Sequence, residues 1–296
     1  MRRHQLTWKT HSLDLGAQTR IMGILNITPD SFSDGGRYFS PDIALAHAEQ
    51  MVADGADIID IGGESSRPFS EPVSVEEECR RVVPVIEKLA GRIAVPISID
   101  TTKAAVARQA IAAGAAIVND ISALRLDPEL GRVIAESNVP VILMHMKGMP
   151  ADMQVAPEYR DLIGEISAFL SQAVERAESM GIERAKMIID PGIGFGKTVS
   201  HNLCLIQHLG DFQRLELPIL IGSSRKAFIR KILSASGTNE RAPMDPLIET
   251  GTQASVAAAI MNGAQIVRVH DVANTAATVK IVDAIKNANS AAGRPD

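Results

Sequence analysis

Three polar residues, Asp100, Asn119 and Asp190, each close a short run of apolar residues. A carboxylate at the margin of a core needs hydrogen-bond donors or a cation as its partner. A heterocycle that carries an amino group beside a ring N–H offers two parallel donors to one carboxylate, and such paired hydrogen bonds are selective. If the three side chains meet in one cavity, the pattern predicts a site for a heterocycle of this kind.

A second set of residues suits an anion. An apolar run ending at Gly222 continues into Ser223, Ser224, Arg225 and Lys226 at the expected start of a helix. Free backbone N–H groups and the helix dipole favour negative charge there. In an arbitrary protein the same residues would be a capping serine followed by two solvated cations.

Further residues at the ends of apolar runs extend the anion site. Arg67, Arg268 and His270 could bind a phosphate or a pyrophosphate, because a guanidinium matches the geometry of phosphate oxygens. Asn26 and Asp34 could hold a hard divalent cation through oxygen. Each of these signals is weak when taken alone.

The glycine-rich stretch over residues 192–198 is not a nucleotide-binding loop. A P-loop requires G-x-x-x-x-G-K-[ST], and Pro191 stands where its first glycine would be. We interpret the stretch as a glycine-permitted turn. His145 is as consistent with a packed or supporting role as with a catalytic one, and Asp120 is interpreted as a carboxylate that pins a loop.

The elements that would position these side chains recur eight times along the chain. Short Ile- and Val-rich runs that do not alternate with polar residues indicate strands buried on both faces. Helical patterns separate them, for example over residues 41–54, 75–90, 103–113, 161–180 and 250–261. Eight such repeats predict an α/β protein with a (β/α)₈ TIM barrel, whose site lies at the carboxyl ends of the strands. The predicted strands are residues 21–26, 58–61, 97–100, 116–119, 141–145, 187–190, 219–223 and 266–270.

The 296 residues predict a single domain, because a barrel of this type needs roughly 250. Residues 4–20 contain two half-apolar stretches, which we expect to form a hairpin across the barrel floor. A polar tail over residues 288–296 is expected to be flexible.

Composition excludes several classes of function. A formal charge of −5 argues against general nucleic-acid binding, and any anion site must be local. Cys79 and Cys204 lie far apart in predicted helices, so neither a disulfide framework nor a zinc site is indicated. No apolar run is long enough to cross a membrane, and the first residues lack a signal-peptide pattern. We therefore expect a cytoplasmic enzyme with no membrane partner.

Several segments together resemble the dihydropteroate synthase family of folate biosynthesis, from about residue 21 to residue 285. Residues 22–36 read Met-Gly-Ile-Leu-Asn-Ile-Thr-Pro-Asp-Ser-Phe-Ser-Asp-Gly-Gly, and residues 190–197 read Asp-Pro-Gly-Ile-Gly-Phe-Gly-Lys. Residues 55–68, 98–103, 222–226 and 267–271 complete the set in the family's order.

The resemblance implies a transferase of an alkyl group other than methyl. Such enzymes condense 6-hydroxymethyl-7,8-dihydropterin pyrophosphate with p-aminobenzoate, with the help of Mg²⁺. By resemblance, Asp100, Asn119 and Asp190 would bond the pterin edges, Lys226 would contact the ring and Arg268 would stack on it. The implied catalytic residues are Asp100, Asn119, Asp190, Lys226 and Arg268; the implied substrate-binding residues are these five with Asn26, Phe32, Asp34, Ser66, Arg67, Pro68, Phe195 and His270, and Asn26 is the implied metal ligand.

The implied mechanism is SN1-like: pyrophosphate leaves first, and the arylamine traps a resonance-stabilised pterin cation. Loops that carry Phe32 and Asp34, and Ser66, Arg67 and Pro68, would close over that cation, build the p-aminobenzoate pocket and exclude water. A homodimer formed through helices opposite the catalytic end is also implied.

Two positions depart from the family's usual pattern. Phe69 replaces a glycine beside the aryl pocket, from which we hypothesise altered packing of that loop and altered sulfonamide sensitivity. Ala227 replaces a serine that commonly meets the substrate carboxylate. The alternative to a synthase is a noncatalytic barrel that binds a pterin or methyltetrahydrofolate.

Overall fold

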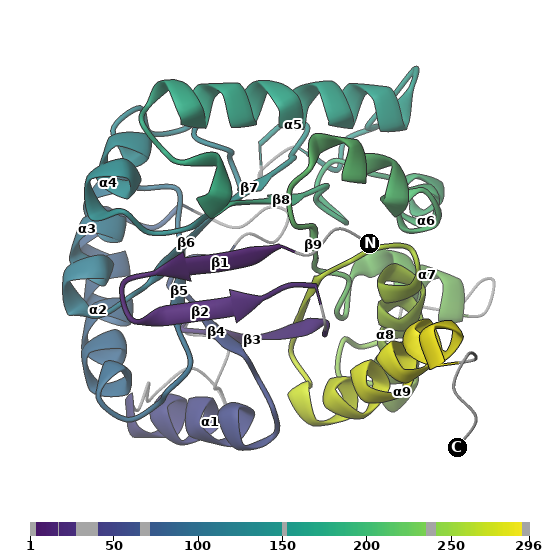
Figure 1. Ribbon diagram of the computed structural model, residues 1–296, viewed down its shortest axis with the longest axis horizontal. Helices are drawn as coiled ribbons and strands as arrows, with labels where there is room; N and C mark the ends of the chain where they lie inside the picture. Colours follow the sequence, from purple (N-terminus) through teal and green to yellow (C-terminus); the bar gives the residue numbers. More distant parts are fainter. Residues whose placement is uncertain are drawn as a thin grey trace.

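The computed structural model describes residues 4–16, 18–27, 41–65, 72–149, 153–234 and 241–291. Its centre is a sheet of eight parallel strands in the order β8-β7-β6-β5-β4-β3-β10-β9 (Figure 1). A parallel bridge between Ile189 and Ile219 joins the two edges, so the predicted (β/α)₈ barrel is confirmed. The strands are β3 Arg20–Asn26, β4 Ile58–Gly62, β5 Ile97–Asp100, β6 Ile117–Asp120, β7 Val141–Met144, β8 Met187–Asp190, β9 Leu220–Ile221 and β10 Ile266–Val269.

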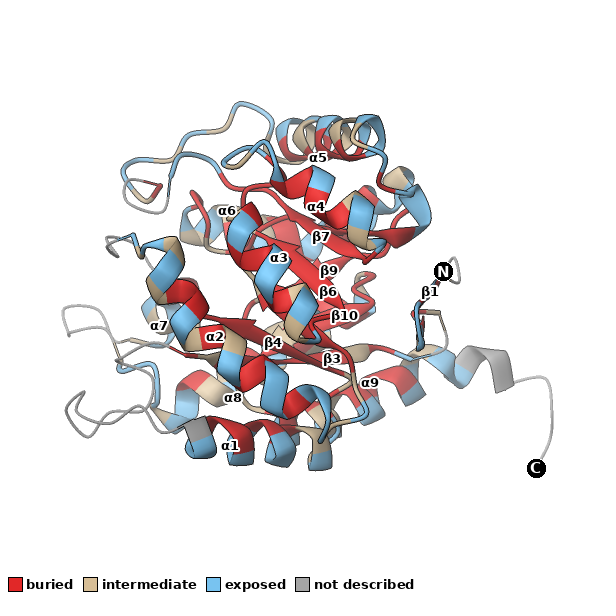
Figure 2. Ribbon diagram, turned by 90° about the vertical axis from the view of Figure 1, so that its left-hand side faces the viewer, coloured by how far each residue is buried: buried red, intermediate tan, exposed pale blue. Residues whose placement is uncertain are grey.

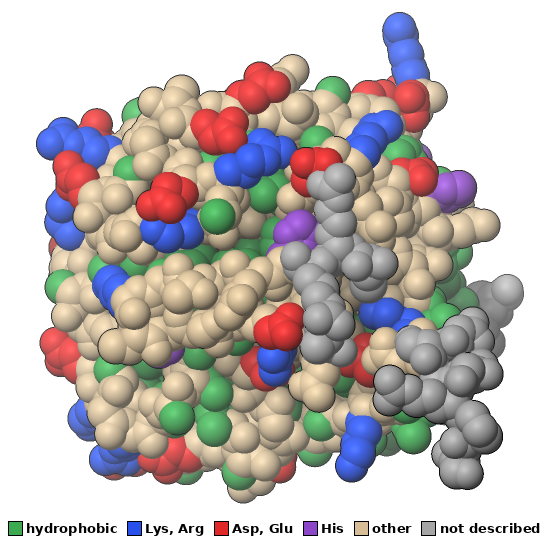
Figure 3. All heavy atoms as spheres, viewed as in Figure 1, with side chains coloured by type: hydrophobic (Ala, Val, Ile, Leu, Met, Phe, Trp, Pro, Cys, Tyr) green, Lys and Arg blue, Asp and Glu red, His purple; other side chains and the backbone are tan. Residues whose placement is uncertain are grey.

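Helices surround the barrel, with their apolar sides against it (Figure 2). They are α1 Pro41–Ala53, α2 Val75–Ala90, α3 Ala104–Ala113, α4 Leu130–Ser137, α5 Leu162–Ser179, α6 Val199–Gln207, α7 Ala227–Leu233, α8 Pro246–Met261 and α9 Val272–Ala291, with short 3₁₀ turns η1 Arg184–Lys186 and η2 Leu209–Leu215. Among the described residues, no helix is long and apolar enough to cross a membrane. On the face shown in Figure 3, cationic and anionic side chains lie interspersed.

Three predicted boundaries were wrong by two residues or more. β9 ends at Ile221 and not at residue 223, because the carbonyl of Ser223 already accepts from the N–H of Lys226 in the turn that follows. α8 starts at Pro246 and not at residue 250, because Asp245 caps it through the Leu247 N–H at 2.9 Å and a proline is favourable in a first turn. α9 continues to Ala291, so the expected tail cannot begin at residue 288.

The N-terminal hairpin is present and covers one end of the barrel. β1 Gln5–Trp8 pairs antiparallel with β2 His11–Asp14, and Figure 2 shows it at one end of the barrel. Four of its residues, Leu6, Trp8, Leu13 and Leu15, are buried in a cluster with the lowest inward-facing residues of the strands, such as Ile58 and Ile188. The floor is therefore closed by apolar packing, and the opposite end remains for chemistry.

Strand alternation decides which residues point into the barrel. Ile58 lies in the interior cluster, whereas Ile59 and Ile61 lie in the outer core with the helices. Because side chains alternate along a strand, Asp60 must face inward like Ile58. The same parity places Asn26, Asp100, Asn119, Asp190, Arg268 and His270 inside, above the apolar layer.

A partly buried ion-pair cluster ties α2 and the start of α3 to the end of β4. The ammonium of Lys103 lies 2.5 Å from Glu64 Oε2 and 2.6 Å from Glu78 Oε2, and Glu78 is fully buried. Glu64 also accepts from the N–H of Val73 at 3.1 Å. Burial alone would lower the pKa of Lys103, but its hydrogen bonds to the two carboxylates outweigh burial and raise it.

We expect Lys103→Met to lower the free energy of unfolding by about 3–5 kcal/mol, because Glu78 would be left charged and unpaired in the core. Urea denaturation measures the loss. Lys88→Met is the matched control: Lys88 is half exposed and lies 3.9 Å from Asp42, so its loss should cost about 1 kcal/mol or less. Equal effects of the two substitutions would contradict this account of the cluster.

Candidate active site

The centre of the barrel mouth is a hydrogen-bonded network around Arg268. Its Nε donates to Asp60 Oδ2 at 2.6 Å, and its Nη2 donates to Asp100 Oδ2 at 2.8 Å. Asn119 Nδ2 donates to the same Asp60 oxygen at 3.1 Å. Four strands, β4, β5, β6 and β10, thus meet at one cluster of side chains.

Asp60 was missed by the sequence analysis. It sits inside a predicted strand, between two isoleucines, rather than at the strand's end. The signal that could have found it is a carboxylate two positions after Ile58, in the inward phase of an apolar strand. Asp60 is fully buried, so Arg268 compensates a charge that could not otherwise remain in the core.

Asp100 shares the guanidinium of Arg268 with a second carboxylate, Asp60. Burial raises the pKa of Asp100 to about 7; Arg268 opposes this rise, and the negative charge of Asp60 adds to it. The guanidinium of Arg268 has a raised pKa, because its two carboxylates outweigh the effect of its burial. The site can therefore take up or release a proton on Asp100 near neutral pH while Arg268 stays charged.

Asp190, Lys226 and Phe195 form the neighbouring wall. The Asp190 carboxylate accepts from the N–H of Gly192 at 2.7 Å, and burial raises its pKa to about 6 against the opposing effects of that bond and of nearby cations. The ammonium of Lys226 lies 4.0 Å from the centre of the Phe195 ring. Burial lowers the pKa of Lys226 to about 8; Arg268 adds to that effect, and Asp190 and Asp100 oppose it.

The hydroxyls of the two serines after β9 form hydrogen bonds within the protein. Ser224 Oγ lies 2.9 Å from His270 Nδ1, and Ser223 Oγ lies 2.8 Å from Ser255 Oγ. Neither serine caps α7, whose N-cap is Lys226. Arg225 is only partly exposed, because it turns toward α8 and lies 3.5 Å from Glu249. The structure thus brings His270 and Lys226 to the mouth and turns Arg225 away.

Asn26 ends β3 at the mouth, beside Asp100. A side chain built on Gly62 would meet Asn26 Oδ1 and Asp100 Oδ2 at the same distance of 3.8 Å, so these two oxygens face a common space. An amide oxygen suits Mg²⁺, which commonly takes few protein ligands and completes its shell with phosphate oxygens and water. In the described part of the chain, no group of three or more His, Cys, Asp or Glu could hold a metal ion. Of the other expected site residues, Phe32, Asp34, Ser66, Arg67 and Pro68 lie outside the described residues, as does Phe69.

The turn after β8 requires its glycines, as predicted. Gly192 has a φ of +73°, and a Cβ there would lie 1.9 Å from the carbonyl oxygen of His145. Gly194 and Gly196 also have positive φ, which side chains other than glycine rarely adopt. Asp120 pins a loop, as interpreted, by accepting from the N–H groups of Ser122 and Leu124 at 2.8 and 2.6 Å, although it belongs to β6.

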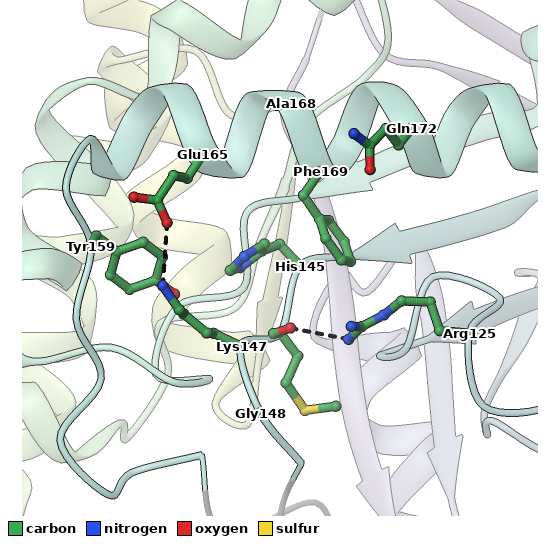
Figure 4. Close-up of a pocket in the computed structure, with 10 residues that line it drawn as sticks. Arg125, His145, Lys147, Gly148, Tyr159, Glu165, Ala168, Phe169 and Gln172 are labelled. Atoms are coloured by element: carbon green, nitrogen blue, oxygen red, sulfur yellow. Dashed lines mark hydrogen bonds and ion pairs between the residues drawn. The ribbon is translucent and has the colours of Figure 1, made fainter.

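A cavity of about 410 Å³ lies outside the barrel, against α5 (Figure 4). His145 points into this region between Tyr159 and Phe169, and its ring meets Phe169 edge-on at 4.7 Å. The inward-facing residues of the barrel mouth do not line this cavity. His145 is therefore packed against α5, and it does not reach the network around Arg268.

Comparison with known proteins agrees with this geometry. A family model described as pterin binding enzyme matches residues 22–270. The dihydropteroate synthase of Synechocystis sp. is 48% identical over 92% of each chain, and that of Escherichia coli is 46% identical over 94% of this chain and 95% of its own. The barrel and its polar mouth thus place the chain in the class of pterin-binding enzymes.

Solved structures narrow the class further. The Yersinia pestis dihydropteroate synthase in a sulfonamide complex superposes with a TM-score of 0.89 at 45% identity, covering 96% of this chain and 99% of that one. The Xanthomonas albilineans enzyme in complex with 7,8-dihydropteroate gives 0.84 at 40% identity, over 95% of this chain and 98% of that one. The chain belongs to the dihydropteroate synthase family.

Proposed function

We propose that the mouth of this barrel condenses 6-hydroxymethyl-7,8-dihydropterin pyrophosphate with p-aminobenzoate, giving 7,8-dihydropteroate and pyrophosphate. The observation that carries the proposal is the network in which Arg268 bridges Asp60 and Asp100. Asn119 donates to the same Asp60 oxygen as Arg268. It places carboxylates, an amide and a cation on four strands around one point. Relatives in the same family have been solved with 4-aminobenzoic acid and with 7,8-dihydropteroate.

The polar groups divide between the two ends of the pterin substrate. Asp100, Asn119 and Asp190 accept from the amino and ring N–H groups, and Lys226 contacts the ring beside Phe195. Arg268 stacks on the ring, which requires that its guanidinium exchange part of its contact with Asp100 for the substrate. Asp60, which has no exposed surface, stays as the anchor of Arg268.

Arg268, His270 and Asn26, together with Arg67, hold the pyrophosphate. Mg²⁺ bound through Asn26 would neutralise charge on the leaving pyrophosphate. Departure of pyrophosphate leaves a positive charge spread over the pterin, and the buried carboxylates of Asp100 and Asp190 stabilise that charge. The arylamine then forms the C–N bond and loses its proton, so no protein nucleophile is needed.

Pyrophosphate release by the purified protein tests the proposal. With dihydropterin pyrophosphate and Mg²⁺, we expect release coupled to dihydropteroate formation when p-aminobenzoate is present. Pterin binding without release or product under both conditions would contradict the proposal and favour the noncatalytic pterin-binding barrel.

The pKa values in the free site predict a bell-shaped pH dependence. Asp190 loses its charge as pH falls through about 6, Asp100 does so near 7, and Lys226 loses its charge as pH rises through about 8. Because kcat/KM reports ionisations of the free enzyme, we expect kcat/KM for the pterin substrate to peak between these limits. Lys226→Arg should shift the alkaline limb upward, because a guanidinium stays charged. An alkaline limb unchanged by this substitution would show that another group sets it.

A homodimer and a cytoplasmic location are further parts of the proposal. Ile232 on α7 and Leu247 and Met261 on α8 are each about half exposed, which supports an apolar contact through these helices. Light scattering on the eluting protein should give twice the chain mass of 31.6 kDa. A monomer at micromolar concentration would contradict the homodimer, and Met261→Glu should weaken the dimer if α8 forms the contact.

A further inference from the structure

Lys197 is a buried lysine that forms no direct ion pair among the described residues; burial lowers its pKa, and the negative charge of nearby Asp190 opposes that effect. Its side chain is 3% exposed, and its ammonium nitrogen lies 2.9 Å from His145 Nδ1 and 2.9 Å from the carbonyl oxygen of Phe195. A lysine can only donate to a carbonyl, whereas the direction of its bond with His145 Nδ1 depends on the histidine tautomer. Burying an amino group that no carboxylate contacts directly is costly, so its place in the core needs a reason.

The surroundings of Lys197 show what it holds. Three consecutive carbonyls of the turn after β8 each accept a hydrogen bond from a side chain, two of them from the segment after β7 and one from Lys197 of the turn itself. Gln154 donates to Gly194, Lys197 donates to Phe195, and the Tyr159 hydroxyl donates to Gly196 at 2.9 Å. Among these three donors, Lys197 is the one bonded to Phe195, whose ring faces the site.

The other side of the same turn supports Lys226. The Phe195 ring lies 4.0 Å from the Lys226 ammonium, and a Cβ on Gly194 would meet Lys226 Cδ at 3.0 Å. A shift of the turn therefore moves the surface on which Lys226 rests. Lys197 and Lys226 lie on opposite sides of one strip of backbone, with Phe195 between them.

We propose that Lys197 is a positioning residue of the synthase site, which fixes the Phe195 carbonyl from behind and thereby sets the ring against which Lys226 meets the pterin. This inference rests on the proposed function for its consequence in catalysis, but its structural part concerns the free protein. His145 is the second support, because its ring is packed edge-on against Phe169 and holds Nδ1 toward Lys197.

The test compares two buried lysines at opposite ends of the barrel. Lys197→Met keeps most of the length of the side chain and removes the donor. Lys186→Met is the control, because Lys186 is 8% exposed near the floor and donates to Glu183 at 2.8 Å. Since small displacements of positioned groups cost up to about 100-fold, we expect kcat/KM for the pterin substrate to fall about 10- to 100-fold in Lys197→Met and less than about twofold in Lys186→Met. Wild-type kcat/KM in Lys197→Met would overturn the proposal.

A double-mutant cycle with Phe195→Ala distinguishes positioning from direct contact. If Lys197 acts through Phe195, the double variant should be no slower than Phe195→Ala alone. Multiplying effects would show that Lys197 acts on the substrate independently of Phe195, which contradicts the proposal.

Titration of Lys226 in the free protein separates this inference from the proposed activity. With ¹³C-methylated lysines assigned by NMR, the pKa of Lys226 should lie near 8 in the wild type and move toward the ordinary value of 10.5 in Lys197→Met, as water reaches the loosened ring. An unchanged pKa of Lys226 in Lys197→Met would overturn the positioning role of Lys197, even if the protein is an active synthase. A shifted pKa in a protein without synthase activity would support the positioning role and contradict the proposed function. His145→Phe removes only the second support and should shift the same titration less, so it continues the test if Lys197→Met does not fold.

Discussion

Arg268→Met is expected to abolish most activity and to destabilise the free protein as well. The guanidinium is the shared partner of a fully buried Asp60 and of Asp100, at 2.6 and 2.8 Å. Removing one member of a buried ion pair typically costs about 3–5 kcal/mol, because the remaining charge stays uncompensated. Loss of the group proposed to contact both the pterin and the pyrophosphate should lower kcat/KM by about 10³-fold or more. Denaturation curves and initial rates measure the two effects separately.

Asp60→Asn, introduced into Arg268→Met, should separate stability from chemistry. The double variant lacks the unpaired charge, so we expect it to recover much of the lost unfolding free energy and none of the lost activity. Arg20→Met is the matched control, because Arg20 pairs with Asp57 at 2.9 Å at the opposite end of the barrel. It should cost some stability and leave kcat/KM unchanged. Recovery of activity in the double variant would show that Arg268 takes no part in the reaction.

Asp190→Asn should give the opposite pattern: a large loss of activity with no loss of stability. The amide oxygen of asparagine can still accept from the N–H of Gly192, so the turn keeps its bond. The negative charge that the mechanism requires is gone, and we expect kcat/KM to fall by about 10²- to 10³-fold.

The sign of the stability effect follows from the raised pKa of Asp190. A folded pKa of about 6, against an ordinary 3.8, means that the ionised carboxylate penalises the folded state. That penalty is absent below about pH 4, grows as pH rises through 6, and reaches about 3 kcal/mol at most. Asp190→Asn should therefore match the wild type at low pH and exceed its stability above pH 7. A variant less stable than the wild type at high pH would contradict this reasoning.

Asp120→Asn is the control for both measurements. Asp120 is as buried as Asp190, but its carboxylate accepts from Ser122 and Leu124 in the loop after β6. An amide has one acceptor oxygen for these two donors, so we expect a loss of about 1–3 kcal/mol and nearly unchanged kcat/KM.

The sequence predicted the barrel because each buried strand, together with the apolar residues beside it, shows as an apolar run. It predicted β5 and β8 to the residue. It misplaced the start of α8 because residues 246–249 carry little helical periodicity, and the signal was the Asp245–Pro246 cap instead. β9, with two residues, is too short for any pattern to fix its ends.

Most site residues were predictable because a polar group stood at or near the end of an apolar run, and Asp60 was the exception. Asp100, Asn119 and Asp190 follow apolar runs and stand out, whereas Asp60 stands among isoleucines. The partners of Arg268 could not be derived, because they depend on how far the side chain reaches across the barrel from β10. The internal bonds of Ser224 with His270 likewise depend on the register of β9 against β10, which the sequence does not specify.

The alternation of inward and outward residues along each strand has a consequence for how this enzyme can change. Ile59 and Ile61 pack against the helices, whereas Asp60 points into the barrel. In β5, Ile99 likewise packs outward and Asp100 points inward. A substitution at an interior position alters ligand contacts without disturbing the helical shell, provided that charges stay matched. Variants with altered inhibitor recognition can therefore arise by single substitutions at little cost in folding. The Asp60–Arg268 pair is the exception, since neither residue can change alone, and an inhibitor that depends on this pair would leave the enzyme few routes to resistance.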